Sequence, residues 1–155
     1  MPCIWLRHNT SQIFMAVAIV PVLPGGGVVV PSNPVIANAL VDTGATTTGI
    51  SANCAVRAGL TPIGRIPIHG VGGTVNQNSY LFHVGFPFAF PPGVLAPNHP
   101  PPSAGQQQLQ VHILDKVIHG CEFHAPPTFE VLLGMDVIST GTLVIQGDGN
   151  FSFSF

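Results

Sequence analysis

Charge is scarce in this sequence. Aspartate, glutamate, lysine and arginine make up 6% of its 155 residues, against roughly 25% in typical globular domains. The four basic residues are scattered along the chain, at Arg7, Arg57, Arg65 and Lys116. This scatter excludes the basic surface that nucleic-acid-binding proteins use, so we expect no nucleic-acid partner. With few charges, more of the surface is apolar or weakly polar, which suits a subunit that packs against a copy of itself.

Cysteines are few and odd in number: Cys3, Cys54 and Cys121. Such a sparse set argues against a disulfide framework. A reducing compartment is the simpler expectation, and we therefore expect a cytoplasmic protein. Cys54 is expected in the core of a short helix, because small cysteines are often buried.

Long apolar runs are also missing. No run reaches the length needed to cross a bilayer, so we expect no membrane association. The apolar segment 13–23 is expected to be a first β-strand. A cleaved signal peptide is the alternative, which Pro21, Pro24 and the lack of a small-residue cleavage site disfavour.

Helical periodicity is nearly absent, and 18 glycines and 16 prolines divide the chain into short segments. Apolar, β-branched runs recur between turn signals, at 13–22, 28–30, 35–41, 80–86, 109–114, 129–133 and 143–146. This pattern is typical of an all-β domain. Two short helices are expected as well. One covers 52–58, between Ser51 as N-cap and Gly59 as its end, and one begins near Asp136, which would accept bonds from the first amides, and stops by Gly141.

The length suits one domain, 1–155, with a core over about 13–146 and a C-terminal strand extension over 147–155. Residues 87–108 contain seven prolines. Because proline removes a ladder donor, we expect a long surface loop inserted here and no central strand. A proline-rich ligand for another domain is the alternative interpretation.

One short motif contains a candidate catalytic carboxylate. The apolar run 39–41 delivers Asp42 to the end of a strand, and Thr43, Gly44 and Ala45 follow it. Gly44 permits a sharp turn, and Thr43 offers a hydroxyl that can fix the loop. Alone, this tripeptide barely differs from an ordinary turn after a strand.

Two further segments accompany this motif. Leu132, Leu133 and Gly134 follow an apolar run far downstream and precede the second expected helix. Between the two lies a glycine-rich segment with the character of a mobile hairpin tip, formed by His69, Gly70, Val71, Gly72 and Gly73. A phosphate-binding loop is excluded there, because no Gly-Lys-Ser/Thr and no helix pattern follow.

In this order and at this spacing, the three segments resemble the retropepsin-like aspartic proteases, especially their bacterial and eukaryotic branch. The likeness covers about 13–146. It implies a small, closed β-barrel-like acid-protease fold with a glycine-rich flap hairpin. It also implies an aspartic endopeptidase that cleaves a peptide or protein substrate, without a cofactor and without a metal.

The resemblance implies a role for each segment. Asp42 would be catalytic, and Thr43 would join hydrogen bonds between the two active-site loops. Gly44 and Ala45 would line the substrate groove. The flap, 69–73, would close over the peptide. Leu132, Leu133 and Gly134 would pack beneath the catalytic loop.

A single catalytic carboxylate calls for a homodimer. Peptide hydrolysis of this type uses one ionised and one protonated carboxyl around a water. The chain has one Asp-Thr-Gly, and no second such motif surrounds the other acidic residues, Asp115, Glu122, Glu130, Asp136 and Asp148. A two-fold axis would supply the partner by placing Asp42 beside its copy.

The sequence departs from the viral pattern where acidic residues and an arginine often flank the site. Thr46, Thr47 and Met135 stand there, so an ion pair is missing and another contact must support the loop. The phenylalanines that alternate with serines over 151–155 predict a strand. This strand either packs in the dimer or groove, or covers the subunit's own core.

Two other functions are open. A non-catalytic dimeric binding module can use the same fold. A zinc site is the other alternative, since ligand types occur together at His112, His119, Cys121 and His124, although their spacing matches no familiar zinc module.

Overall fold

The computed structural model describes residues 2–8, 11–25, 34–70, 72–89 and 109–155. The expected strand at 28–30 and most of the expected loop, 90–108, lie outside these residues. Strands and two short helices alternate in the order β1 (Cys3–Arg7), β2 (Phe14–Pro21), β3 (Val35–Val41), β4 (Gly49–Ser51), α1 (Ala52–Arg57), β5 (Gly64–Gly70), β6 (Gly73–Ala89), β7 (Leu109–Phe123), β8 (Val131–Leu133), α2 (Met135–Ile138), β9 (Thr142–Ile145) and β10 (Asn150–Ser154). The all-β prediction with two short helices is confirmed.

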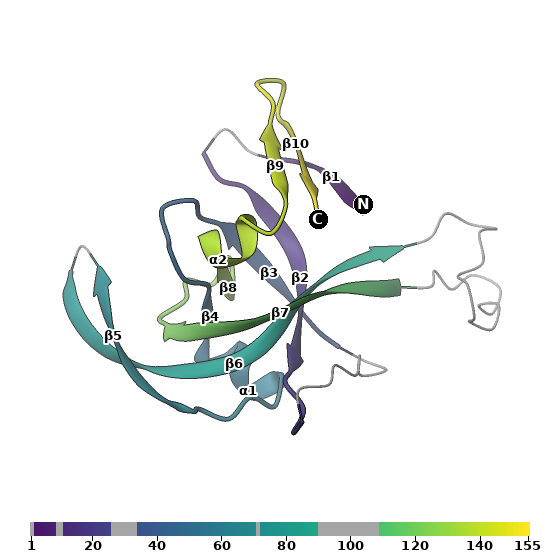
Figure 1. Cartoon of the computed structure of the whole chain (residues 1–155). Helices are drawn as coiled ribbons and strands as arrows, with labels where there is room; N and C mark the ends of the chain where they lie inside the picture. Colours follow the sequence, from purple (N-terminus) through teal and green to yellow (C-terminus); the bar gives the residue numbers. More distant parts are fainter. Residues whose placement is uncertain (1, 9–10, 26–33, 71, 90–108) are drawn as a thin grey trace.

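Six of the strands form a closed barrel (Figure 1). Their order is β2-β3-β8-β4-β7-β6, and β2 also pairs with β6, which closes the ring. Strand β5 pairs with β6 outside this ring, as half of a long hairpin that projects from the barrel. Closure removes unpaired strand edges from the barrel. The paired end of β6 and start of β7 also extend away from it, on the side opposite the β5–β6 hairpin (Figure 1).

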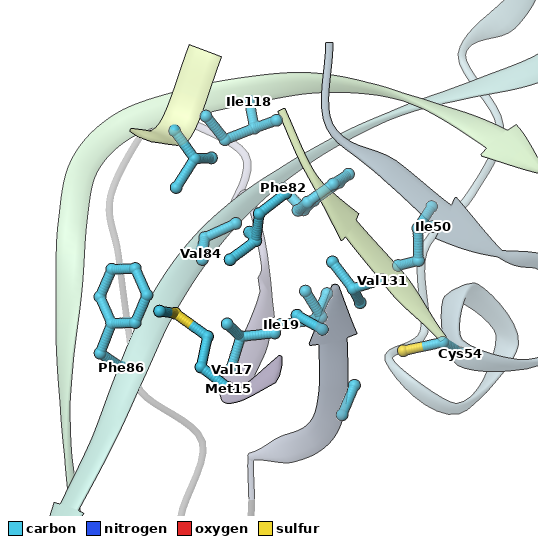
Figure 2. Close-up of a cluster of buried hydrophobic side chains, with 14 of the residues drawn as sticks. Met15, Val17, Ile19, Ile50, Cys54, Phe82, Val84, Phe86, Ile118 and Val131 are labelled. Atoms are coloured by element: carbon cyan, nitrogen blue, oxygen red, sulfur yellow. The ribbon is translucent and has the colours of Figure 1, made fainter. Parts of the chain in front are cut away.

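The barrel encloses the hydrophobic core (Figure 2). Strand β2 contributes Met15, Val17 and Ile19, and the neighbouring strand β6 contributes Phe82 and Val84, all of them buried. Residues 14–21 are therefore a core strand, as the strand prediction for this segment required. Among the described residues, no helix is long and apolar enough to cross a membrane.

Strands β6 and β7 are longer than their apolar runs predicted. Pro87 pairs with Val111 inside the β6–β7 ladder, so the prediction of a loop from residue 87 is wrong for 87–89. Proline fits because the pairing of β2 with β6 reaches no further than Gly85, which leaves Pro87 with one neighbouring strand. The register also shifts between His83 and Gly85, where β7 bulges.

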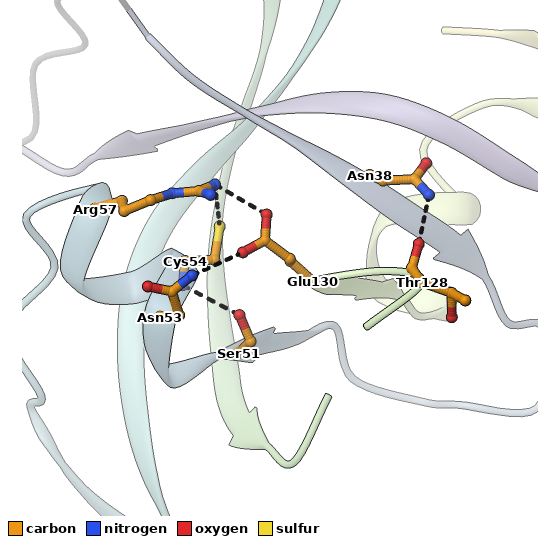
Figure 3. Close-up of polar contacts among 7 residues, drawn as sticks. All are labelled: Asn38, Ser51, Asn53, Cys54, Arg57, Thr128 and Glu130. Atoms are coloured by element: carbon orange, nitrogen blue, oxygen red, sulfur yellow. Dashed lines mark hydrogen bonds and ion pairs between the residues drawn. The ribbon is translucent and has the colours of Figure 1, made fainter. Parts of the chain in front are cut away.

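Helix α1 begins and ends as the sequence predicted. The Ser51 side chain accepts a bond from the Cys54 N–H (3.1 Å), and Gly59 follows the helix with φ of 68°. Arg57 forms an ion pair with Glu130 (3.0 Å), and Asn53 donates to the same carboxylate (3.3 Å), as Figure 3 shows. These contacts fasten the helix to the segment that enters β8.

The two chain ends meet in a three-stranded sheet of order β1-β10-β9. Strand β10 is central, so neither of its edges is free. Phe151 and Phe153 are buried, and the Phe155 ring lies 4.3 Å from the Phe86 ring, centroid to centroid. Of the two interpretations of this tail, the structure supports the one in which it covers the subunit's own core.

Candidate active site

The position of Asp42 follows from the pairing of β3. Strand β3 runs parallel to β8, with Val41 opposite Leu133. The Asp42 N–H continues the ladder by donating to the Leu133 carbonyl (2.9 Å). A carboxylate is thereby fixed where β3 and β8 end side by side, and the Asp42 residue is half-buried.

The residues after Asp42 form a tight turn. The Gly44 N–H donates to Asp42 Oδ1 (2.8 Å), and the Ala45 N–H donates to the Asp42 carbonyl (3.2 Å). A Cβ on Gly44 would lie 3.2 Å from the same Oδ1. Glycine therefore allows the backbone to approach the carboxylate closely, and the turn orients one of its two oxygens. Thr43 is exposed at the tip of the turn.

The segment after β8 binds this turn from below. The Met135 N–H donates to the Ala45 carbonyl (2.8 Å), and the Asp136 N–H donates to the Thr46 carbonyl (3.3 Å). A Cβ on Gly134 would lie 2.6 Å from the Thr47 carbonyl carbon, so only glycine fits without a shift of the backbone. Leu133 is buried and Leu132 is half-buried.

Asp136 and Thr48 form the contact that the missing ion pair called for. The Asp136 carboxylate accepts bonds from the Thr48 hydroxyl (2.6 Å) and the Thr48 N–H (3.0 Å). The same hydroxyl accepts a bond from the Gly134 N–H (3.1 Å). Thr48 is fully buried. Charge-assisted bonds of this kind are among the stronger ones in proteins, so they hold the loop firmly.

The prediction for Asp136 as a helix cap needs correction. Helix α2 has Gly134 at its N-cap and no side-chain cap. The Asp136 carboxylate accepts from the Val137 N–H (3.0 Å) but is directed chiefly to Thr48, on another loop. Lys116, in the bulge of β7, donates to the Asp136 carbonyl (2.7 Å). Sequence reasoning missed Thr48 and Lys116, because neither lies in a motif.

A depression of about 460 Å³ opens beside the carboxylate. Asp42 and Thr43 are among the residues that line it. His8, which follows β1, and Ile145 of β9 line it as well. The Asp42 turn therefore lies next to the sheet that joins the chain ends.

The glycine-rich segment forms the predicted hairpin tip. Gly70 pairs with Gly73 at the end of the β5–β6 ladder, and His69 Nδ1 lies 2.8 Å from the Thr74 hydroxyl. Gly72 lies in the turn, and residue 71 lies outside the described residues.

A second depression, of about 240 Å³, lies beneath this hairpin. It is lined by Ile68 and Val75 from the hairpin and by Glu122 and Phe123 from β7. The Tyr80 hydroxyl donates to Glu122 Oε2 (2.6 Å). Burial, together with this bond, raises the pKa of Tyr80. The depression combines an apolar wall with one anchored carboxylate.

Among the described residues, no three histidine, cysteine, aspartate or glutamate side chains lie close enough together to hold a metal ion. His112, His119, Cys121 and His124 belong to this described part and form no such group. Burial raises the pKa of Cys121, which keeps its thiol protonated and makes it a poor metal ligand.

No family model and no curated protein matches the sequence. The structure, however, is similar to the crystal structure of a retropepsin-like aspartic protease from Rickettsia conorii, with a TM-score of 0.54. The alignment covers 98% of this chain and 89% of that chain. The chain has the retropepsin-like fold. At 14% identity the likeness is one of fold.

Proposed function

We propose that the protein is an aspartic endopeptidase that works as a homodimer on peptide or protein substrates. The observation that carries this proposal is the Asp42 turn at the joint end of β3 and β8, within a retropepsin-like fold. Its backbone bonds to 133–136 hold the carboxylate in a fixed place. Neither a cofactor nor a metal enters this proposal.

The reaction needs two carboxyls around one water. One Asp42 is ionised and takes a proton from the water, while its copy is protonated and donates to the carbonyl oxygen of the peptide bond. Two such groups in contact cannot both ionise easily, so the pair holds one proton, as in aspartic proteases generally. Their titration belongs to the pair and to neither residue alone.

The turn suits this task. The Gly44 N–H occupies Asp42 Oδ1, which leaves Oδ2 directed at water and at the copy of Asp42. Thr43, at the exposed tip, bonds to the partner's loop. Gly44 and Ala45 border the substrate, and 132–134 support the turn from beneath.

The β5–β6 hairpin acts as the flap. It projects from the barrel (Figure 1). In this proposal its glycine-rich tip, 70–73, closes over the bound peptide. The depression under the hairpin accepts a side chain of the peptide, with Ile68, Val75 and Phe123 as its apolar wall. Closure would exclude water other than the nucleophile.

Digestion of a peptide library tests the proposal. The Asp42→Asn variant removes the carboxyl and should abolish cleavage while leaving the fold and the dimer intact. Asp115→Asn is the matched control, because Asp115 is an exposed aspartate on β7, and it should cleave like the natural protein. An inhibitor of aspartic proteases should reproduce the loss. Cleavage that persists in Asp42→Asn would refute the enzyme, and a dimer without cleavage in the natural protein would favour a binding module.

A further inference from the structure

Strand β9 has a free, uncharged edge beside the catalytic loop. In the three-stranded sheet, β10 pairs with β1 on one side and β9 on the other. Within the described residues, no strand pairs with the outer edge of β9. Its sequence, Thr-Leu-Val-Ile, has no charge and no proline, and such an edge is open to pairing with another strand.

The hydrogen-bonding pattern between β9 and β10 determines which backbone groups of β9 point outward. The Gln146 N–H donates to the Asn150 carbonyl (2.9 Å). Hydrogen-bonded pairs alternate along an antiparallel ladder, so Val144 and Thr142 also direct their groups at β10. Leu143 and Ile145 therefore direct their N–H and C=O groups outward, away from the sheet.

The side chains of β9 are also incompletely covered. Val144 is 44% exposed and Ile145 is 55% exposed. Val144 lies on the face turned away from the core, in line with Ser152 and with Trp5, which is 66% exposed. Ile145 shares the depression of Asp42.

Strand β9 is also joined closely to the catalytic loop. It begins at Thr142, shortly after α2 ends at Ile138 (Figure 1). The Met135 N–H of α2 binds the Ala45 carbonyl, and Leu143 lines a small pocket together with Val41, the residue before Asp42. A partner bound at this edge would thus lie beside Asp42.

We propose that two copies of the chain join by antiparallel pairing of β9 with β9, which makes one six-stranded sheet across the two-fold axis. This inference rests on the proposed function, because a lone Asp42 is an incomplete site. In the register that pairs all the outward N–H and C=O groups, Leu143 lies opposite Ile145 of the second subunit. Val144 then lies opposite Val144 of the second subunit, at the two-fold axis. The interface is then β9, and the tail 151–155 stays inside its own subunit.

This register fixes the distance between the two copies of Val144. It places the two copies of Val144 in a non-hydrogen-bonded pair, with Cα atoms about 4.5 Å apart. That separation lies within the range that a disulfide spans. A cysteine at this position should therefore link the two subunits.

The test uses Val144→Cys in a Cys3→Ser background, because Cys3 is an exposed thiol whereas Cys54 and Cys121 are buried. Under mild oxidation, most of the chain should migrate as a disulfide-linked dimer. Val117→Cys in the same background is the control, because Val117 is a comparably exposed valine on β7, and it should remain unlinked. Val144→Lys should raise the dimer dissociation constant by about tenfold or more, because like charges meet at the axis, and Val117→Lys should leave it unchanged.

The outcomes separate the two proposals. A Val144→Cys dimer without peptidase activity in the natural protein supports the interface and overturns the proposed function. A dimeric, active enzyme that neither links through residue 144 nor weakens with Val144→Lys overturns the interface alone. A natural protein that is monomeric at all concentrations overturns the interface as well.

Discussion

At the scale of single residues, the Asp136 carboxylate is the group that fixes the loop after Asp42. It holds both the hydroxyl and the N–H of the buried Thr48. In the proposed reaction Asp136 would touch no reacting atom, so it is a positioning residue. Its effect on cleavage would pass through the backbone between Thr48 and Asp42.

Thr48→Val tests this role. Valine has the same shape but lacks the hydroxyl. The Asp136 carboxylate therefore loses its hydroxyl donor and keeps only its bonds from the N–H groups of residues 48 and 137, and the Gly134 N–H loses its acceptor. The free energy of unfolding should fall by about 1–3 kcal/mol. The kcat for peptide cleavage should fall by about tenfold or more, with a smaller change in KM, because the Asp42 carboxyl loses its position. Urea unfolding and steady-state kinetics measure both effects.

Thr48→Ser is the matched control, since serine keeps the hydroxyl. It should restore most of the stability and of kcat. Equal losses in the valine and serine variants would mean that packing of the methyl group, and not the bond to Asp136, supports the loop.

The three cysteines should differ sharply in reactivity. Burial, reinforced by the negative charge of Glu130 and opposed by Arg57, raises the pKa of Cys54 from its ordinary value of 9.0 to about 11. The thiolate is the reactive form, so at pH 8 a thiol reagent should label Cys3 and spare Cys54 and Cys121 until the protein is denatured. Mass spectrometry counts the labels, and fast labelling of Cys54 in the folded protein would contradict the buried site.

The same shift has a consequence for stability. Because the pKa of Cys54 is higher in the folded than in the unfolded chain, the folded state holds this proton more tightly. Its contribution to stability is complete below about pH 9 and disappears as the pH rises through about 11.

At the scale of elements, the joint between β8 and α2 depends on the lack of a side chain at Gly134. A Cβ there would lie 2.6 Å and 2.8 Å from the carbonyl carbon and oxygen of Thr47. Displacing backbone atoms costs more free energy than rotating a side chain, so Gly134→Ala should lower the free energy of unfolding by about 1–3 kcal/mol. It should lower activity too, because the displaced atoms belong to the loop of Asp42.

Gly147→Ala provides the comparison. A Cβ added at Gly147 would have no atom within 4 Å, so this replacement should change the free energy of unfolding by less than about 0.5 kcal/mol. Urea unfolding of both variants measures the difference. Similar, small effects at the two glycines would contradict the close packing of the joint.

Elements whose apolar runs coincide with burial could be predicted from the sequence. The run 35–41 is strand β3 itself, and Ser51 and Gly59 mark the two ends of α1. The runs 80–86 and 109–114 identified only parts of β6 and β7. Beyond them these strands are held by backbone pairing in the hairpin and across the bulge, where polar residues interrupt the apolar pattern.

The candidate site could be predicted to a similar extent. The Asp42 turn, the hairpin tip and 132–134 each carry a local signature, and the structure brings the first and the last of them together. Thr48, Lys116 and the carboxylate contact of Asp136 carry none, because their partners lie far away in the chain and are chosen by the tertiary fold.

At the scale of the whole molecule, the proposed active site is a property of two chains. Each subunit supplies a complete barrel, a hairpin and one Asp42, and the barrel closes without help from a partner. In the proposed dimer, the second subunit supplies the second carboxyl. Activity should therefore rise more steeply than in proportion to protein concentration wherever the dimer is partly dissociated.

The most direct test of this claim mixes natural subunits with Asp42→Asn subunits and allows them to exchange. If both carboxyls are needed, an equimolar mixture keeps about one quarter of the activity of the same total amount of natural protein, because only dimers with two natural subunits cleave. If each chain acts alone, the mixture keeps about one half. The shared-carboxyl mechanism predicts the first value, and the second would contradict it.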